Sequence, residues 1–268
     1  MRLKSVLLSL STVAVLFAGG AHASANLVTN GDFESTTNGG NKQLAASTAA
    51  TVKNDKLTTL TGWTSSNGND GGFNFVLSSG IADTWDSVKW LKGKNNGYTD
   101  SANGGNFFAS DPVYHPGTLT QTISGLTVGS AYTLTFDYAL AQQTGFRGAN
   151  EDNYWAVSFG GVTQNSDLLS IENGGFSGWS TATMNFTATS VTQALSFLAK
   201  GTAPGAPPFL LLDGVSMVAT VPEPETWAML LGGLGLVGFV ARRRRVNNWA
   251  VNLAVNPLSI LLDSFSNI

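Results

Sequence analysis

Apolar and polar residues alternate with a period of two through the middle of the chain, a pattern typical of β-strands with one buried face. The alternation is strongest in five stretches: 132–138, 155–159, 182–186, 195–197 and 210–213. Turn-forming residues separate these stretches, among them Gly125, Gly129, Gly160, Gly174 and Pro204. No stretch of comparable length has the period of a helix. The pattern predicts an all-β fold, an antiparallel β-sandwich, between residues 26 and 220.

Composition narrows the class of protein. Of the 268 residues only 12% are charged, 43% are hydrophobic and 31 are glycine, which fits neither a charged disordered chain nor a coiled coil. The absence of cysteine excludes disulfides, a thiol nucleophile and cysteine-based zinc sites. Residues 26–220 carry 14 acidic and 8 basic side chains, a net charge of −6, so nucleic acid is not expected as a partner.

The N-terminus has the features of a secretory signal peptide. Arg2 and Lys4 precede an apolar run at residues 6–18, and small residues follow it up to Ala25. Cleavage after Ala23 or after Ala25 fits this pattern equally well. Because the apolar run is short for a membrane span, we expect residues 1–25 to be removed during export rather than to stay as an anchor.

A second signal stands near the C-terminus and has three parts in order. Pro222, Glu223 and Pro224 come first, an apolar, glycine-rich stretch at 227–241 follows, and the stretch ends in a basic cluster of Arg242, Arg243, Arg244 and Arg245. As a helix the apolar stretch would be about 22 Å long, shorter than the roughly 30 Å of a bilayer's hydrocarbon core. We expect it to be a short transmembrane helix whose arginines stay on the cytoplasmic side.

These three parts resemble the PEP-CTERM sorting signal of Gram-negative bacteria. The resemblance implies an exosortase-type processing enzyme as partner, a transient stay in the inner membrane, and release or transfer to the cell surface. Such signals end at the arginines, whereas here residues 246–268 continue as an atypical extension. The predicted organisation is therefore a signal peptide (1–25), a β-sandwich domain (26–220), a sorting and anchor segment (221–245) and the extension (246–268).

The middle region also resembles the galactose-binding-like jelly rolls found in many carbohydrate-binding modules. The motifs that carry this resemblance are residues 26–34, 62–63, 119–123, 126–134 and 212–217. The resemblance implies a jelly-roll sandwich and leaves the ligand open, because one sandwich fold serves many ligands. From their size alone, Phe33, Trp63 and Tyr132 are expected in the core rather than at a binding site.

Two acidic residues of these motifs are candidates for metal binding. Glu34 and Asp213 stand beside residues that should be buried, on the first and last segments of the domain. A buried carboxylate needs a cation or several hydrogen-bond donors. In related sandwiches the carboxylates at these positions help to hold a structural calcium ion, an ion that accepts oxygen ligands from separate strands. The alternative is that both are hydrogen-bonded turn carboxylates.

A long segment at 78–106 interrupts the strand pattern and carries the candidate ligand-binding residues. Trp85, Trp90 and Tyr98 stand there among amide and charged side chains, a composition that suits the binding of a sugar. Long loops of this kind are usually functional or mobile. The alternative is that the tryptophans close one end of the sandwich. Trp155 and Trp179 are weaker candidates.

The sequence does not predict an enzyme. Glu151 and Asp152 are adjacent, so in a strand they would point to opposite faces and could not flank one glycosidic bond. Neither a Gly-x-Ser-x-Gly motif nor a phosphate-binding loop occurs. We expect an exported, surface-sorted, non-catalytic protein associated with extracellular polysaccharide. The alternatives are a structural matrix or adhesion protein without a sugar site and, less favoured, a polysaccharide hydrolase.

Overall fold

The computed structural model describes residues 25–45, 56–66, 73–83, 91–202, 207–220, 229–230 and 232–243. Ser24–Thr220 make up one compact unit, and the C-terminal helix is described separately. The predicted signal peptide, the Pro222–Glu223–Pro224 triplet, Arg244, Arg245 and the extension lie outside the described residues, apart from Ala25.

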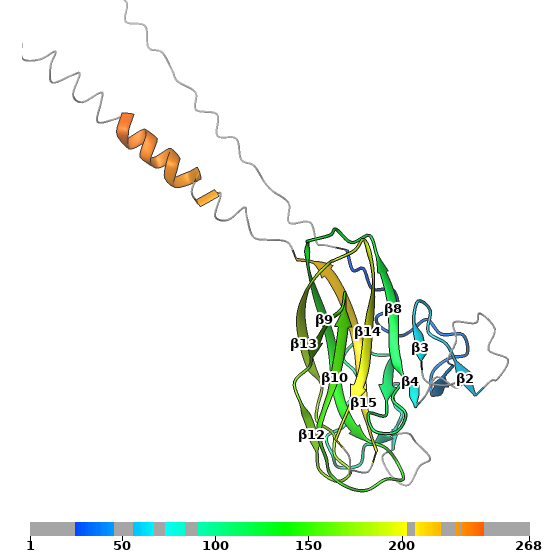
Figure 1. The fold of residues 1–268 in the computed structure, drawn as a ribbon. Helices are drawn as coiled ribbons and strands as arrows, with labels where there is room; N and C mark the ends of the chain where they lie inside the picture. Colours follow the sequence, from blue (N-terminus) through cyan, green and yellow to red (C-terminus); the bar gives the residue numbers. More distant parts are fainter. Residues whose placement is uncertain are drawn as a thin grey trace, which may run out of the picture. The chain divides into compact units, whose positions relative to one another are not determined.

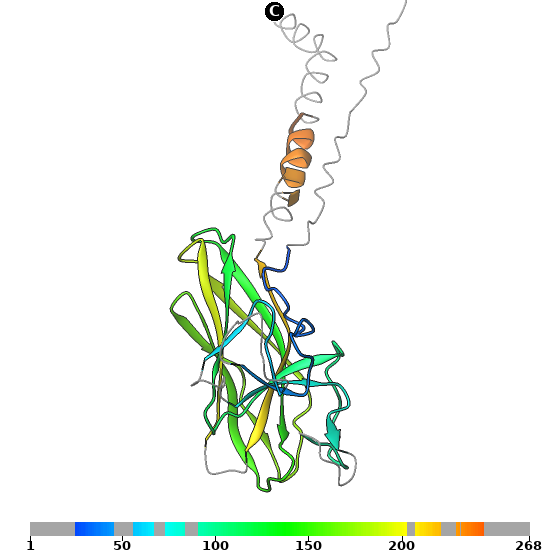
Figure 2. The ribbon, with the colours of Figure 1, turned by 90° about the vertical axis from the view of Figure 1, so that its right-hand side faces the viewer.

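Two sheets face each other in the compact unit (Figures 1 and 2). The seven-stranded sheet has the order β13 (Ser180–Thr187), β9 (Ala131–Gln142), β15 (Pro208–Ala219), β7 (Asn106–Ser110), β4 (Asn74–Ser78), β1 (Lys42–Leu44) and β2 (Leu57–Thr58). The six-stranded sheet has the order β11 (Val162–Asn165), β10 (Asn150–Phe159), β14 (Thr192–Lys200), β8 (Thr118–Ser124) and β3 (Thr64–Ser66), with β12 (Leu169–Ile171) paired to β10. All pairings in these two sheets are antiparallel except that of β1 with β2. The predicted antiparallel β-sandwich is confirmed.

The main core lies between the two sheets and follows from the period-two alternation. On β9, Leu134 and Phe136 are buried, and on β14 Leu195 and Phe197 face them from the other layer. Phe136 and Phe197 meet edge to face, with 5.2 Å between their ring centroids. The predicted core residues Phe33, Trp63 and Tyr132 are buried in this cluster, and so is Trp155, which is therefore not a surface ligand residue.

The seven-stranded sheet buries part of its outer face as well. Its middle strands carry continuous apolar runs, and β15 shows this best because Phe209 and Leu211 are buried on the opposite face from Leu210 and Leu212. The outer cluster is covered by Ile81 and Leu91 from the 78–106 segment and by Phe176 and Trp179 from the loop before β13. A strand buried on both faces loses the alternation that marks a half-buried strand.

The start of the unit is fastened to its last strand. The backbone N–H of Leu27 donates to Met217 O at 2.8 Å, and that of Val215 donates to Gly31 O at 2.9 Å. A β-carbon at Gly31 would lie 2.0 Å from the carbonyl oxygen of Val215, so only glycine allows this approach. Asn30 next to it has a φ of 53°, a left-handed backbone conformation that asparagine tolerates in turns.

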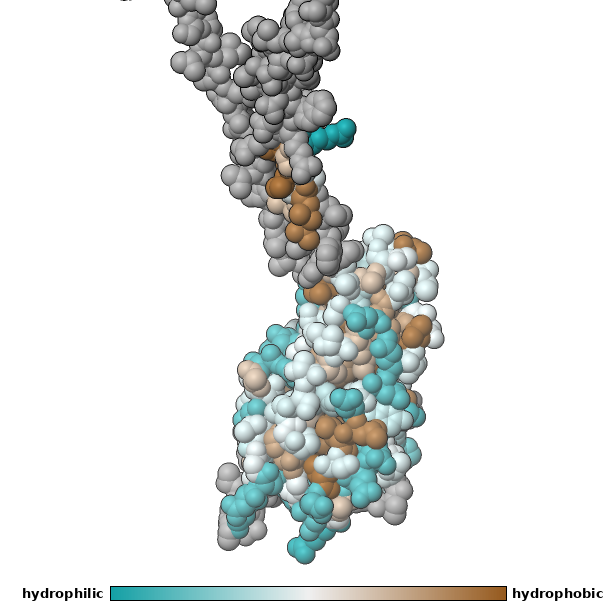
Figure 3. All heavy atoms as spheres, turned by 90° about the vertical axis from the view of Figure 1, so that its left-hand side faces the viewer, coloured by the Kyte–Doolittle hydropathy of each residue, from teal (hydrophilic) through white to brown (hydrophobic). Residues whose placement is uncertain are grey.

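The C-terminal helix is described at 229–230 and 232–243, so it overlaps the predicted short helix at 227–241 and continues into Arg242 and Arg243. Its apolar side chains, among them Leu236, Val237 and Phe239, are exposed. The described part of the helix is largely brown in Figure 3, whereas the sandwich in that view is mostly pale or teal with separate brown patches. Among the described residues, no helix combines the length and apolar character that a membrane crossing needs. That the whole stretch 227–241 spans a membrane stays a prediction.

Candidate functional site

Asp213, the first metal candidate, is fully buried and held by protein donors. Its Oδ2 accepts a hydrogen bond from Ser101 Oγ, and its Oδ1 accepts one from the backbone N–H of Gly214 at 2.7 Å. Asp137 lies opposite it on β9, where the strand pairing shifts register. The pKa of Asp213 is raised to about 6. Burial is the main cause and the charge of Asp137 adds to it, while the hydrogen bonds from Ser101, Gly214 and Asn103 oppose it.

Glu34, the second candidate, is exposed, contrary to the burial expected for it. Its Oε1 accepts a hydrogen bond from the backbone N–H of Asn106 at 2.6 Å. The carboxylate sits over Gly105, whose φ is 62° and where a β-carbon would lie 1.8 Å from Oε1. Glu34 and Asp213 thus hold the two ends of the same short loop, 101–106, that leads into β7.

The surroundings of these carboxylates offer calcium only part of a site. Among the described residues, no group of three or more His, Cys, Asp or Glu side chains is placed to hold a metal. The usual six to eight oxygen ligands of calcium would have to be completed by carbonyl, amide and hydroxyl oxygens of these loops. Calcium at Glu34 and Asp213 stays a prediction.

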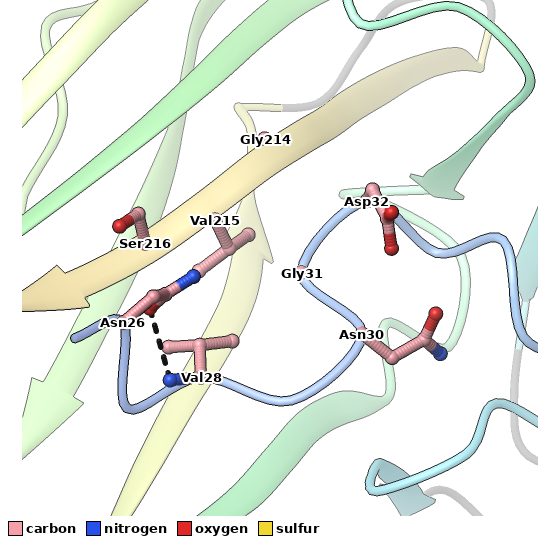
Figure 4. A pocket seen from close by; sticks show the side chains of 8 residues that line it. All are labelled: Asn26, Val28, Asn30, Gly31, Asp32, Gly214, Val215 and Ser216. Atoms are coloured by element: carbon pink, nitrogen blue, oxygen red, sulfur yellow. Dashed lines mark hydrogen bonds between the residues drawn. The ribbon is translucent and has the colours of Figure 1, made fainter.

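A pocket of about 300 Å³ adjoins this region, between the first turn and β15 (Figure 4). Its amide side chains already hold the backbone. Asn26 Oδ1 accepts hydrogen bonds from Val28 N at 3.0 Å and Met217 N at 2.9 Å, and Asn30 Nδ2 donates to carbonyl groups of Ser35 and Thr61. The polar side chains of this pocket therefore hold the first turn against the last strand, β15.

Tyr98, of the three aromatic candidates in the 78–106 segment, lies on the outer face of the seven-stranded sheet. It is half-buried, its ring centroid is 5.0 Å from that of Phe176, and its hydroxyl donates to Asp100 Oδ1 at 3.0 Å. Burial and the Asp100 carboxylate raise its pKa far above the ordinary value. Trp85 and Trp90 lie outside the described residues, and sugar binding by these three residues stays a prediction. Trp179, a weaker candidate, is half-buried, and its Nε1 donates to Thr99 O at 3.0 Å.

Large exposed aromatic side chains gather instead on loops at the end of the sandwich opposite Thr220. Phe73 is 41% exposed, Tyr114 52% and Phe146 43%. The register places them there, because β9 starts beside Thr220 and ends at Gln142, which pairs with Pro208 at the start of β15. Phe73 directly precedes β4, Tyr114 lies between β7 and β8, and Phe146 follows β9.

Asp111 ties these loops together. It is buried, its Oδ1 accepts hydrogen bonds from the backbone N–H groups of Val113 and Tyr114 at 2.9 Å, and its Oδ2 accepts one from Gln143 Nε2 at 2.9 Å. Burial raises the pKa of Asp111, while these donors lower it. Phe73 packs against His115 with 5.8 Å between ring centroids and the two rings tilted. The aromatic side chains therefore stand on loops with fixed backbones, as a binding surface requires.

Comparison with known families identifies the three-part motif near the C-terminus. Residues 220–245 match the family model described as the PEP-CTERM protein-sorting motif. The chain carries a PEP-CTERM sorting motif. The match covers the triplet and all four arginines, so the predicted sorting signal is confirmed, and it implies export with membrane-anchored sorting. Of the motif residues, Arg242 and Arg243 lie at the end of the described helix.

Solved structures resemble this PEP-CTERM chain at low sequence identity, and no curated protein sequence matches it. TmCBM61 in complex with beta-1,4-galactotriose is 13% identical, with 74% of this chain and 100% of that chain covered and a TM-score of 0.38. The CBM22-1 xylan-binding domain of Paenibacillus barcinonensis Xyn10C is 10% identical, with 76% and 99% covered and a TM-score of 0.37. The K1 adhesin domain of Lys-gingipain from Porphyromonas gingivalis W83 is 13% identical, with 60% and 92% covered and a TM-score of 0.36.

Sequence reasoning missed the exposed aromatic loops. Phe73, Tyr114 and Phe146 stand outside the long segment 78–106, which was predicted to carry the ligand-binding residues. A signal was present at 114–117, where Tyr-His-Pro-Gly has the composition of a surface turn that displays its aromatic residue. For Phe73 and Phe146 nothing in the local sequence distinguishes an exposed phenylalanine from a core one.

Proposed function

We propose that this PEP-CTERM protein is exported, sorted to the cell surface and binds extracellular polysaccharide without catalysis. The observation that carries the proposal is the set of exposed aromatic residues Phe73, Tyr114 and Phe146 at the end of the sandwich away from Thr220. Three large rings exposed at one end of the sandwich offer apolar surface to an interaction partner. Sugars have apolar faces that stack on such rings and hydroxyl groups that hydrogen-bond to the surrounding polar atoms.

The position of these loops also supports the proposal. The chain continues from Thr220 directly into the sorting motif. The aromatic loops lie at the other end of the strands, which is the end of the sandwich farthest from Thr220. A binding module that is held at one end and carries its ligand surface at the other leaves that surface open to a polymer.

The test is retention of the full chain, purified in a mild detergent, on a glycan array that includes the producer's own polymer. We expect retention on at least one glycan, and we expect the double variant Tyr114→Ala/Phe146→Ala to weaken it about tenfold, since each lost ring contact is worth roughly 0.5–1.5 kcal/mol. Val191→Ala, an exposed apolar residue on another loop, is the control and should bind like the wild type.

A structural matrix or adhesion protein without a sugar site would give no retention on any glycan, and that result would overturn the proposal. Retention that survives the double variant would refute the assignment to these loops. Release of new reducing ends from a retained polymer would show a hydrolase instead.

A further inference from the structure

A basic pocket lies close to the aromatic loops. It has a volume of about 320 Å³ and is lined by Lys92, Lys94, Arg147, Asn173 and Gly174. None of these lining residues is acidic. Residues 26–220 contain only 8 basic side chains and have a net charge of −6, yet three of those basic residues line this one pocket. Three basic side chains at one pocket of an acidic domain create a local positive potential, which attracts anionic groups.

The pocket is built by three chain segments that are hydrogen-bonded to one another. Lys92, on the short strand β6 (Leu91–Lys92), donates from Nζ to the carbonyl oxygen of Phe146. Asn96 Nδ2 donates to Lys92 O at 2.8 Å and to Gly174 O at 2.9 Å. Asn173 Oδ1 accepts from the backbone N–H of Gly148 at 2.8 Å. These contacts fix the backbones from which Lys94 and Arg147 project, and both side chains are exposed.

We propose that this pocket binds the carboxylate groups of an acidic polysaccharide, a polyuronate. The inference rests on the proposed glycan binding and names the class of glycan. The planar guanidinium of Arg147 can donate two parallel hydrogen bonds to one carboxylate, and the lysine ammonium groups add positive charge beside it. Phe146, which directly precedes Arg147, offers an exposed ring to the sugar that carries the carboxylate.

The acidic remainder of the domain gives the site its selectivity. Double-stranded DNA carries one negative charge per about 1.7 Å of helix axis, so it meets strong repulsion wherever it runs beyond the pocket onto the negatively charged surface. A polyuronate presents carboxylates spaced by whole sugar rings, and its rings reach the aromatic loops. Binding through a few charge pairs beside aromatic contacts should weaken with salt but persist at 0.15 M ionic strength.

The test uses the full chain in detergent with polygalacturonate, with the same polymer after chemical reduction of its carboxyl groups, and with double-stranded DNA. We expect polygalacturonate to bind at least tenfold more tightly than either of the others. The double variant Lys94→Gln/Arg147→Gln should lower the affinity for polygalacturonate about tenfold, as the loss of two exposed charge pairs predicts. Lys200→Gln removes one exposed charge outside the pocket and should leave the affinity unchanged.

The outcomes separate this inference from the proposal on which it rests. Equal binding of native and reduced polymer, or binding that the double variant does not weaken, would overturn the acidic-sugar assignment and leave glycan binding in place. DNA binding as tight as polygalacturonate, with the same loss in the double variant, would make the pocket a general polyanion patch and would also overturn it. Binding to no glycan at all would overturn both.

Discussion

At the scale of single residues, the two carboxylates predicted to share a metal site have different environments. Asp213 is fully buried and Glu34 is exposed, although both accept hydrogen bonds from the loop 101–106 or its neighbours. Burial therefore disfavours the charged form of Asp213, whereas the exposed carboxylate of Glu34 stays hydrated. Its pKa is raised to about 6, mainly by burial, and this couples the stability of the sandwich to pH.

We expect Asp213→Asn to remove part of the pH dependence of stability. Because the folded state holds the proton more tightly than the unfolded chain, the contribution of Asp213 is fully present below about pH 4 and is lost as the pH rises through about 6. Asn can accept from Gly214 and donate to Ser101, so the contacts survive without the charge. In chelator, the free energy of unfolding at pH 7.5 should rise by about 1–2 kcal/mol relative to the wild type, with no gain at pH 3.5. Equal differences at both pH values would show that the charge is not the cause.

The calcium prediction belongs to the same two residues. An ion bound only by the folded form at a hundred times its dissociation constant adds about 2.7 kcal/mol, enough to raise the melting temperature by several degrees. Calcium should produce this rise in the wild type, and Glu34→Gln and Asp213→Asn should reduce it. The informative quantity is the calcium-dependent part, because each substitution also changes local hydrogen bonds. A melting curve that is the same in calcium and in excess chelator would leave both residues as hydrogen-bonded carboxylates.

At the scale of elements, the sequence predicted the half-buried strands correctly and could not show what covers the outer face of the sheet. Strands β9, β10, β13 and β14 keep a clear alternation over much of their length because one of their faces is exposed there. β7 and β15 lack this alternation, because Phe107, Phe209 and Leu211 are buried in a second apolar cluster on the outer face of the sheet. Which loop covers that cluster depends on contacts between residues far apart in the chain. For the same reason, the exposure of Phe146 and the grouping of Lys92 with Arg147 could not be derived from local sequence.

We expect Leu91→Ala to destabilise the sandwich by about 2–4 kcal/mol, through the lost apolar contacts and the cavity left behind. Leu91 is fully buried in the outer cluster and starts β6, which also carries Lys92 of the basic pocket. Urea unfolding of the full chain in detergent, followed by tryptophan fluorescence, measures the change. Leu168→Ala is the control, because Leu168 is 59% exposed and its loss should cost under about 0.5 kcal/mol. Equal midpoints for the two variants would contradict the packing of this segment against the sheet.

At the scale of the whole molecule, the chain combines a β-sandwich with a PEP-CTERM sorting motif at 220–245. The last residue of the sandwich, Thr220, still donates its backbone N–H to Ala131 O at 2.9 Å. The matched motif begins at the same residue. No spacer therefore separates the folded unit from the sorting motif in the sequence.

Replacing Pro222, Glu223 and Pro224 with alanine should leave the precursor in the inner membrane, because the processing enzyme would lose the triplet while the apolar stretch and the arginines remain. Cell fractionation measures this. Alanine at Asn247, Asn248 and Asn252, beyond the matched motif, is the control and should sort like the wild type. Equal amounts of the triplet variant and the wild type at the surface would contradict the sorting role of the triplet.

β15 completes the seven-stranded sheet, although it follows all the other strands of that sheet in the sequence. β15 lies between β9 and β7, yet it is the last strand to be synthesised. Until it arrives, β13–β9 and β7–β4–β1–β2 are two separate ribbons with open edges, and the N-terminal segment around Leu27 lacks its partner Met217. For a chain exported N-terminus first, we therefore expect the seven-stranded sheet to close only after residue 219 has emerged, with the sorting motif following directly behind it in the sequence.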